Sequence, residues 1–107
     1  MTDFFFNSRG NWIAFRRNAD DRFFFAPDGT WIGWSPWGDA DVVDTNGDYL
    51  GTIYPDRRLF RRLNQPYRGY PGYPGYPGYP GYPGYPGYAG YVPLPPMTQD
   101  IEELDPA

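Results

Sequence analysis

The chain has 107 residues and a formal net charge of −4 at pH 7. It contains no Cys, His or Lys, which excludes disulfides, thiolate metal sites, histidine general bases and Schiff-base lysines. The acidic balance speaks against a general nucleic-acid binder, and the sequence predicts no cofactor. The first residues lack the basic start and long apolar run of a signal peptide, so we expect a cytoplasmic protein, or one peripheral to the inner face of the membrane.

An internal repeat organises the first two thirds of the chain. Residues 4–15 and 23–34 are identical at six of twelve positions with an offset of 19 residues, and a third copy, 41–52, follows at an offset of 18. Each copy consists of an apolar run, a turn that ends in Gly and a second aromatic or aliphatic run. A weaker fourth copy starts at Leu59 and lacks the turn glycine. Repeats of this length indicate a modular array or a closed symmetric assembly.

Each copy has the composition of a β-hairpin. Asp28-Gly29 and Asn46-Gly47 predict two-residue type I′ turns, while Arg9-Gly10 fits a longer loop with a left-handed glycine. Hairpins arranged around an axis would bury their aromatic faces and remove exposed strand edges. We therefore predict an all-β domain over residues 1–66, a closed or nearly closed array of three to four hairpin petals. Residues 57–64 would form its last strand and pair back to the first.

The repeats resemble a known family. The units 4–15, 23–34 and 42–54, the run Trp31–Asp39 and the Tyr-Pro-Gly tail are similar to the bacterial four-fold beta flower proteins. The resemblance covers residues 2–66 and implies a shallow barrel of hairpin petals, like the C-terminal domain of Tubby-like proteins. It implies no catalytic residues. Tubby-like domains bind phosphoinositide head groups, but their basic lipid site has no motif match in this chain.

Acidic side chains are the first candidates for chemistry. Asp44, Asn46 and Asp48 match positions 1, 3 and 5 of an EF-hand loop, but Tyr49 and Pro55 fail positions 6 and 12. A polar hairpin turn explains these residues without a metal. Paired carboxylates for glycoside hydrolysis would have to come from the turn residues, and no nucleophile elbow or triad spacing accompanies them. We therefore expect a protein that is not an enzyme. The carboxylates considered are Asp39, Asp41, Asp44 and Asp48.

The tryptophans divide into two pairs. Trp12 and Trp31 align with each other in the repeat, so they are expected in the core. Trp34 and Trp37 lie in a stretch rich in Pro and Gly and are expected to form an exposed aromatic patch. Segment 23–34 also looks like the choline- or glucan-binding repeats of bacterial surface proteins. The patch is therefore a candidate site for a carbohydrate or for choline.

Four arginines follow in the last strand of the predicted domain. The sequence allows an anion or lipid head-group site, since guanidinium groups suit phosphates. It equally allows an edge strand that charge keeps soluble. The four are Arg57, Arg58, Arg61 and Arg62.

The tail is the most regular part of the chain. Residues 67–91 repeat Tyr-Pro-Gly, which predicts a disordered arm biased to polyproline II, and residues 92–107 are expected to be a disordered, Pro-rich and acidic end. The acidic end would act as a solubilising cap or pair with the arginine cluster. Evenly spaced tyrosines favour many weak contacts or self-association over one strong contact. The adhesive tyrosines are Tyr70, Tyr73, Tyr76, Tyr79, Tyr82, Tyr85, Tyr88 and Tyr91.

The leading functional hypothesis is a non-enzymatic interaction module. Its β-domain would dock on a protein partner or surface, and its tail would supply multivalent contacts. The alternatives are peripheral membrane association through the arginine cluster and recognition of a carbohydrate or choline by exposed aromatic rings.

Overall fold

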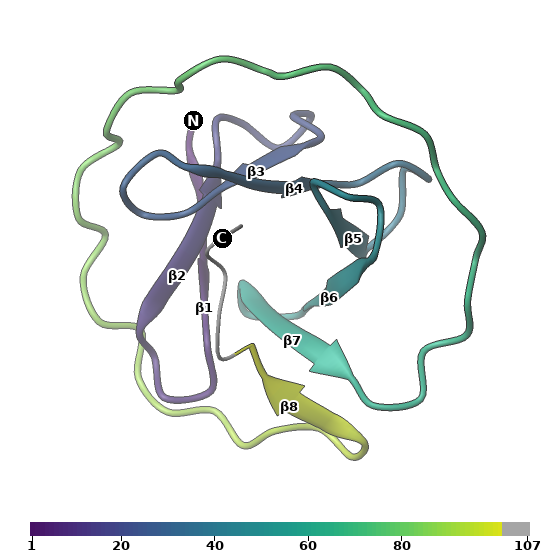
Figure 1. The fold of residues 1–107 in the computed structure, drawn as a ribbon. Helices are drawn as coiled ribbons and strands as arrows, with labels where there is room; N and C mark the ends of the chain where they lie inside the picture. The colour runs from purple at the N-terminus through teal and green to yellow at the C-terminus, as the bar shows by residue number, and fades with distance from the viewer. Residues whose placement is uncertain (102–107) are drawn as a thin grey trace.

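Strands follow one another in chain order around a single sheet that closes on itself (Figure 1). The computed structural model describes residues 1–101. Successive strands are antiparallel, and β1 also pairs in parallel with β7 through Phe6 and Arg58, which closes a seven-stranded barrel. The eight strands are β1 (Asp3–Phe6), β2 (Trp12–Arg16), β3 (Phe23–Phe25), β4 (Trp31–Trp34), β5 (Asp41–Asp44), β6 (Tyr49–Tyr54), β7 (Arg58–Arg62) and β8 (Thr98–Asp100).

The all-β prediction is confirmed for residues 1–101, which contain no helix and thus none long and apolar enough to cross a membrane. The barrel contains more strands than the predicted array of three to four petals describes. Three hairpins (β1–β2, β3–β4 and β5–β6) are followed by the single strand β7, and β8 is an addition to the sheet. The expected return of the last strand to the first is present as the pairing of β7 with β1.

The three hairpins share one turn geometry, and it differs from the predicted type I′ turn. In the first, the Gly10 amide donates to the Asn7 carbonyl and the Asn7 amide donates to the Asn11 carbonyl; the same pattern recurs at residues 26–30 and 44–48. The glycine has a φ near +90° in all three, whereas Asp28 and Asn46 are absent from the positive-φ residues. A type I′ turn needs positive φ at both central residues. The register shift beside each turn indicates a three-residue loop with a glycine bulge instead.

Two layers of apolar side chains stabilise the barrel. The interior cluster contains repeat-equivalent residues, such as Phe5, Phe24 and Val42, together with Ile32 and Leu59. A second cluster lies on the other side of the strands. Its buried members are Phe15, Phe25, Trp31, Trp34 and Val43. Because aromatic runs place side chains on both faces of each strand, the outer face also needs a cover.

The chain beyond residue 66 supplies that cover and an additional strand, unlike the disordered tail that the sequence predicts. Residues 67–91 run around the outside of the barrel (Figure 1), and β8 pairs with β7 through Phe60 and Asp100. Ile101 is buried in the interior cluster. The acidic residues expected to cap the end lie outside the described residues from position 102 onwards, but Asp100 is described and accepts hydrogen bonds from the Ser8 amide and hydroxyl, at 2.8 and 2.6 Å.

Candidate functional site

Residues 67–91 form what we call the tyrosine belt, and its backbone is not polyproline II. Every glycine in it has φ between 81° and 92°, whereas polyproline II needs φ near −75° at each residue. A glycine with positive φ at every third residue interrupts the polyproline II geometry, although residues 67–91 form no hydrogen-bonded turn among themselves. The belt follows the barrel around its circumference (Figure 1).

The belt contacts the three hairpin turns in a constant register. Tyr70 lies on Gly47, Tyr79 lies on Gly29 and Tyr88 lies on Gly10. A Cβ at Gly47 or Gly10 would stand 2.8 Å from the tyrosine ring, and a Cβ at Gly29 would also overlap its ring. These contacts are nine residues apart in the belt, so three Tyr-X-Gly triplets span one hairpin. The glycine that each turn needs for its backbone also provides the flat surface on which a ring packs.

Between these contacts, pairs of tyrosines bracket a tryptophan. Trp31 packs edge-on against Tyr73 and Tyr76, with ring centroids 5.7 and 5.9 Å apart. Trp12 packs against Tyr82 and Tyr85 at 6.0 and 6.1 Å. Both indoles are fixed in the same way, because each donates its Nε1 proton to the carbonyl two residues ahead. The repeat in the barrel thereby produces a matching repeat of contacts along the belt.

An arginine clasp fastens the first end of the belt. The Arg68 guanidinium donates to Asp39 at 2.7 Å and to Asp41 at 2.9 Å, and it lies 4.1 Å from the centre of the Trp37 ring. The hydrogen bond from Arg68 is the largest cause that holds the pKa of Asp39 below its usual value, and the same bond raises the pKa of Arg68. Arg68 and Asp39 lie near solvent and Asp41 is buried, so the clasp combines an exposed ion pair, a more buried one and the aromatic stacking.

A buried arginine fastens the other end. Arg58 is 1% exposed, and its guanidinium donates to the carbonyls of Asn7, Gly90 and Ala89 at 2.7, 2.9 and 3.1 Å. The Ala89 amide donates to the Gly10 carbonyl, which adds a backbone bond beside it. Arg58 thus joins β7, the first hairpin turn and the end of the belt.

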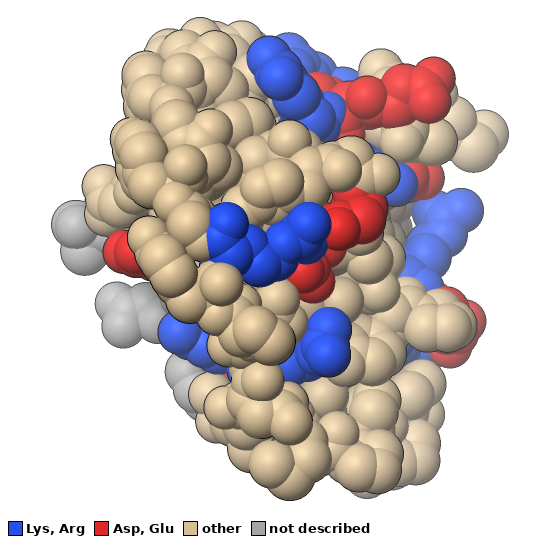
Figure 2. Space-filling view, turned by 90° about the vertical axis from the view of Figure 1, so that its right-hand side faces the viewer, with Lys and Arg blue, Asp and Glu red and all other residues tan. Residues whose placement is uncertain are grey.

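The predicted arginine cluster is therefore divided. Arg58 points into the protein and is occupied by carbonyl groups, while Arg61 and Arg62 are exposed. Arg57 lies in the turn before β7 and reaches Asp3 only at 4.0 Å. On the face that Figure 2 shows, basic and acidic side chains lie next to one another instead of forming a patch of one sign. The structure does not assemble the four guanidinium groups into one anion site.

The predicted exposed patch of Trp34 and Trp37 is also different in the structure. Trp34 is only 5% exposed and belongs to the outer cluster. Trp37 packs against that cluster and is covered by Arg68. Trp31 is buried, as expected, and Trp12 is half-buried with its ring against the belt. The tail covers Trp12, Trp31 and Trp37, which a prediction of a disordered tail could not include.

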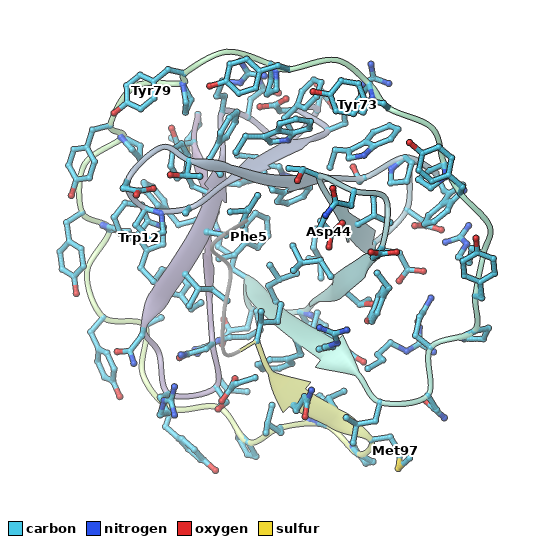
Figure 3. All side chains as sticks on the ribbon, viewed as in Figure 1. Phe5, Trp12, Asp44, Tyr73, Tyr79 and Met97 are labelled. Atoms are coloured by element: carbon cyan, nitrogen blue, oxygen red, sulfur yellow. The ribbon has the colours of Figure 1, made fainter. Side chains whose placement is uncertain are left out.

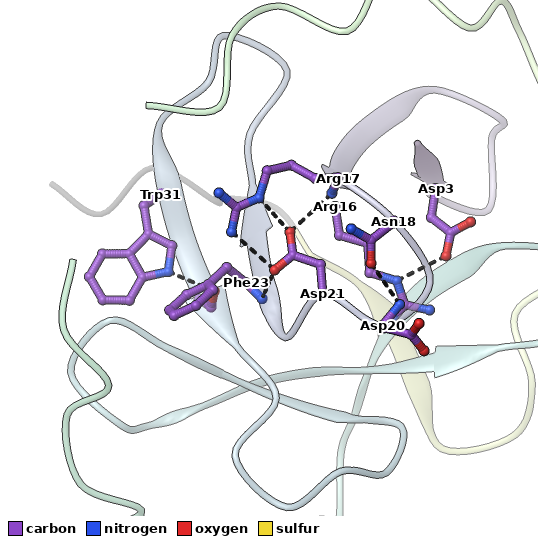
Figure 4. A network of polar contacts seen from close by, with 9 residues as sticks. Asp3, Arg16, Arg17, Asn18, Asp20, Asp21, Phe23 and Trp31 are labelled. Atoms are coloured by element: carbon purple, nitrogen blue, oxygen red, sulfur yellow. Dashed lines mark hydrogen bonds and ion pairs between the residues drawn. The ribbon is translucent and has the colours of Figure 1, made fainter. Parts of the chain in front are cut away.

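The acidic turn residues have structural hydrogen bonds. Asp44 Oδ1 accepts the amides of Asn46 and Asp48, as an Asx turn does. Burial of Asp21 opposes its ionisation, but hydrogen bonds from Arg17 and the Phe23 amide outweigh it and lower the Asp21 pKa (Figure 4). Within residues 1–101, no group of three acidic side chains is arranged to hold a metal ion.

The belt leaves most of each tyrosine ring in solvent. Figure 3 shows the rings along its whole length, including Tyr73 and Tyr79. The eight rings from Tyr70 to Tyr91 are 61–71% exposed. An open groove of about 620 Å³ lies where the belt crosses the second and third hairpin turns. The candidate functional site is therefore this ring of tyrosines together with its groove.

Comparison of the chain with protein-family models, with curated proteins and with solved structures found no match.

Sequence reasoning identified the tyrosines but missed what they contact. One signal was available: residues 67–91 contain nine tyrosines at a spacing of three, and the barrel contains three hairpins with a turn glycine. Nine tyrosines for three hairpins give three tyrosines for each hairpin, and this ratio would have predicted a belt that follows the hairpins. The roles of Arg58, Arg68 and Asp100 had no comparable signal, since their partners lie between 27 and 92 residues away in sequence.

Proposed function

We propose that this protein is a non-enzymatic interaction module whose tyrosine belt makes weak, multivalent contacts, including contacts with other copies of the same chain. One observation carries the proposal: eight evenly spaced tyrosine residues are 61–71% exposed although the belt is anchored at both ends. Large exposed aromatic surface marks interaction sites. Rings that are already positioned lose little conformational entropy on binding, and their number multiplies a weak contact.

The test is a graded substitution series in the full chain. Tyr73, Tyr79 and Tyr85 are changed to Ser one, two and three at a time, and self-association is measured by sedimentation velocity over a range of concentrations. Multivalent association predicts a progressive fall, with the triple variant at least about tenfold weaker. The matched series with Phe keeps the rings and should retain most of the association.

Two results would contradict this proposal. Serine variants that associate as strongly as the parent chain would show that the tyrosines do not form the contact. Loss of all association from a single substitution, with an unchanged melting temperature, would indicate one specific site instead of many weak contacts.

Peripheral membrane binding stays a weaker proposal, because only Arg57, Arg61 and Arg62 remain for a head group. Sedimentation with anionic and neutral vesicles tests it. Salt-sensitive binding to anionic vesicles that Arg61→Ala weakens would support it, and equal binding to both vesicle types would contradict it.

A further inference from the structure

We propose that the groove between the second and third hairpin turns binds a linear oligosaccharide. The inference goes beyond the proposed function, since it needs an ordered belt but no self-association. The groove has the volume of a ligand site, at about 620 Å³. The belt forms one wall and the two turns form the other. Its lining residues are Asp28, Gly29, Thr30, Trp31, Thr45, Asn46, Tyr73, Tyr76 and Tyr79.

The aromatic wall is positioned before any ligand arrives. Tyr73 and Tyr76 each pack against Trp31 in an edge-to-face arrangement, and Tyr79 packs against Gly29. The three rings are nonetheless 61–67% exposed. Flat rings presented in series match the apolar C–H faces of successive sugar rings, because each ring can cover one face without ordering a new side chain.

The opposite wall offers hydrogen-bonding groups of the kind that hydroxyls need. The Asn46 side chain is exposed and can both donate and accept. Asp28 Oδ1 accepts the Thr30 amide at 2.9 Å, which holds the carboxylate at the rim. That amide bond is also the largest cause of the lowered Asp28 pKa, so Asp28 is an acceptor at neutral pH. Thr30 and Thr45 add hydroxyl groups.

The charge of the lining selects among ligand classes. Neither Arg nor Lys lines the groove, and Asp28 is its one charged group, so a phosphate or carboxylate ligand has no partner there. A neutral ligand with many hydroxyls suits both walls. A quaternary ammonium ion would also favour tyrosine faces and a carboxylate, but it is bound by rings that converge on one point as a cage. Tyr73, Tyr76 and Tyr79 instead follow one another along the belt.

The experiment uses the full chain, labelled with ¹⁵N, at a concentration where it is monomeric. Its amide spectrum is recorded with hexasaccharides of β-1,4-glucose, α-1,4-glucose and β-1,4-N-acetylglucosamine, and separately with choline chloride. We expect at least one hexasaccharide to shift the resonances of residues 28–31 and 45–46. Unchanged spectra with every hexasaccharide would overturn the proposal, and so would shifts with choline alone.

Two matched pairs of variants locate the site. Tyr76→Ala removes a ring from the groove, and Tyr85→Ala removes the ring in the equivalent position beside Trp12. Asn46→Ala and Arg9→Ala change the equivalent position of two hairpin turns. We expect Tyr76→Ala to weaken saccharide binding about tenfold or more and Asn46→Ala about two- to tenfold, with the two controls unchanged. Equal losses in Tyr76→Ala and Tyr85→Ala would overturn the assignment to this groove. Because the readout is sugar binding by monomers, this inference and the self-association proposal can fail separately.

Discussion

The barrel and the belt hold aromatic side chains in place by different means. In the barrel, ladder hydrogen bonds order the backbone and the side chains then pack on both faces of the strands. In the described part of the belt, hydrogen bonds to the barrel are confined to the two ends, at Arg68 and around Ala89 and Val92. The stretch between them is held by ring contacts in register. The comparison teaches that a segment without secondary structure can be ordered when its repeat matches the repeat of its support.

The two ends of the belt differ as well. In the Arg68 clasp the guanidinium itself lies near solvent and pairs with the exposed Asp39 and the buried Asp41, whereas the Arg58 clasp is a buried guanidinium bound to carbonyl groups. Exposed ion pairs contribute little and depend on pH and salt. Buried charge-assisted hydrogen bonds are costly to break. We therefore expect the belt to loosen first at residue 68 and last at residue 90.

The largest effect should come from Arg58→Ala. This change leaves the carbonyls of Asn7, Ala89 and Gly90 without their donor and opens a cavity at the junction of β7 and the belt. We expect a loss of about 3–5 kcal/mol in the free energy of unfolding, measured by urea denaturation. Arg61→Ala, on the exposed part of the same strand, should change stability by less than about 0.5 kcal/mol. Equal losses from the two variants would show that Arg58 is not a clasp.

Substitutions at two glycines distinguish the free-energy cost of backbone strain from the cost of disturbing the packing of the belt. Gly29 and Gly38 both have positive φ, but a Cβ at Gly29 would overlap the Tyr79 ring and a Cβ at Gly38 would meet no atom within 4 Å. Gly38→Ala should cost about 1–2 kcal/mol for the left-handed backbone alone. Gly29→Ala should cost about 1–3 kcal/mol more, because the ring must move. The same cost for both variants in thermal unfolding would mean that the belt does not pack on the turns.

Acid should release the Arg68 end of the belt alone. The pKa of Asp39 is lowered in the folded protein, so its contribution to stability is present above the unfolded pKa of about 4. That contribution is lost as the pH falls through the lower folded value. We expect a change in Trp37 fluorescence below about pH 4, and Asp39→Asn should abolish most of it.

The other end provides the internal control for this pH experiment. Arg58 is held mainly by three carbonyl groups that do not titrate, beside a longer ion pair of 3.5 Å with the exposed Asp56. The Ala89 amide should therefore stay protected from hydrogen exchange over the same pH range, after correction for the intrinsic exchange rate. Loss of protection at Ala89 together with the Trp37 signal would indicate that the belt detaches as a unit.

The smallest effect concerns the turn between β6 and β7. Asp56 and Arg57 precede β7 with φ of 69° and 59°, whereas the three repeated hairpin turns have a glycine at positive φ. Arg57→Gly should stabilise the protein by about 1 kcal/mol, since glycine adopts this backbone without a steric cost. The 4.0 Å pair with Asp3 offsets little of this gain. An unchanged or lower melting temperature would contradict the assignment of strain to Arg57.

Local sequence signals predicted the barrel better than its turns. Aromatic and aliphatic runs around Phe5, Phe24 and Ile32 indicated the strands, and the repeat indicated closure. The dipeptides Asp28-Gly29 and Asn46-Gly47 marked the correct turns but the wrong turn type. The loop is one residue longer than those dipeptides suggest, because a bulge changes the register between the strands.

The candidate site was less predictable than the fold. Trp34 and Trp37 were expected at the surface because their neighbours are Pro and Gly, yet the outer cluster and Arg68 cover them. Arg58 was grouped with its neighbours in sequence, although alternation in β7 places it on the face opposite the interior residue Leu59, where the end of the belt buries it. Both errors concern burial, which depends on segments that are distant in the chain.

The sequence by itself determined the hairpin repeat, the all-β class and the spacing of the tyrosines, because these follow from local propensity and from counting. Only the tertiary structure decided which face of the hairpins the tail covers, where Arg58 and Arg68 fasten it and that residues 98–100 add a strand beside β7. Those features depend on contacts between segments tens of residues apart, such as Ser8 with Asp100. The match between nine belt residues and one hairpin depends on both levels. The two repeat lengths can be counted in the sequence, but only the closed barrel brings the tyrosines onto the turn glycines.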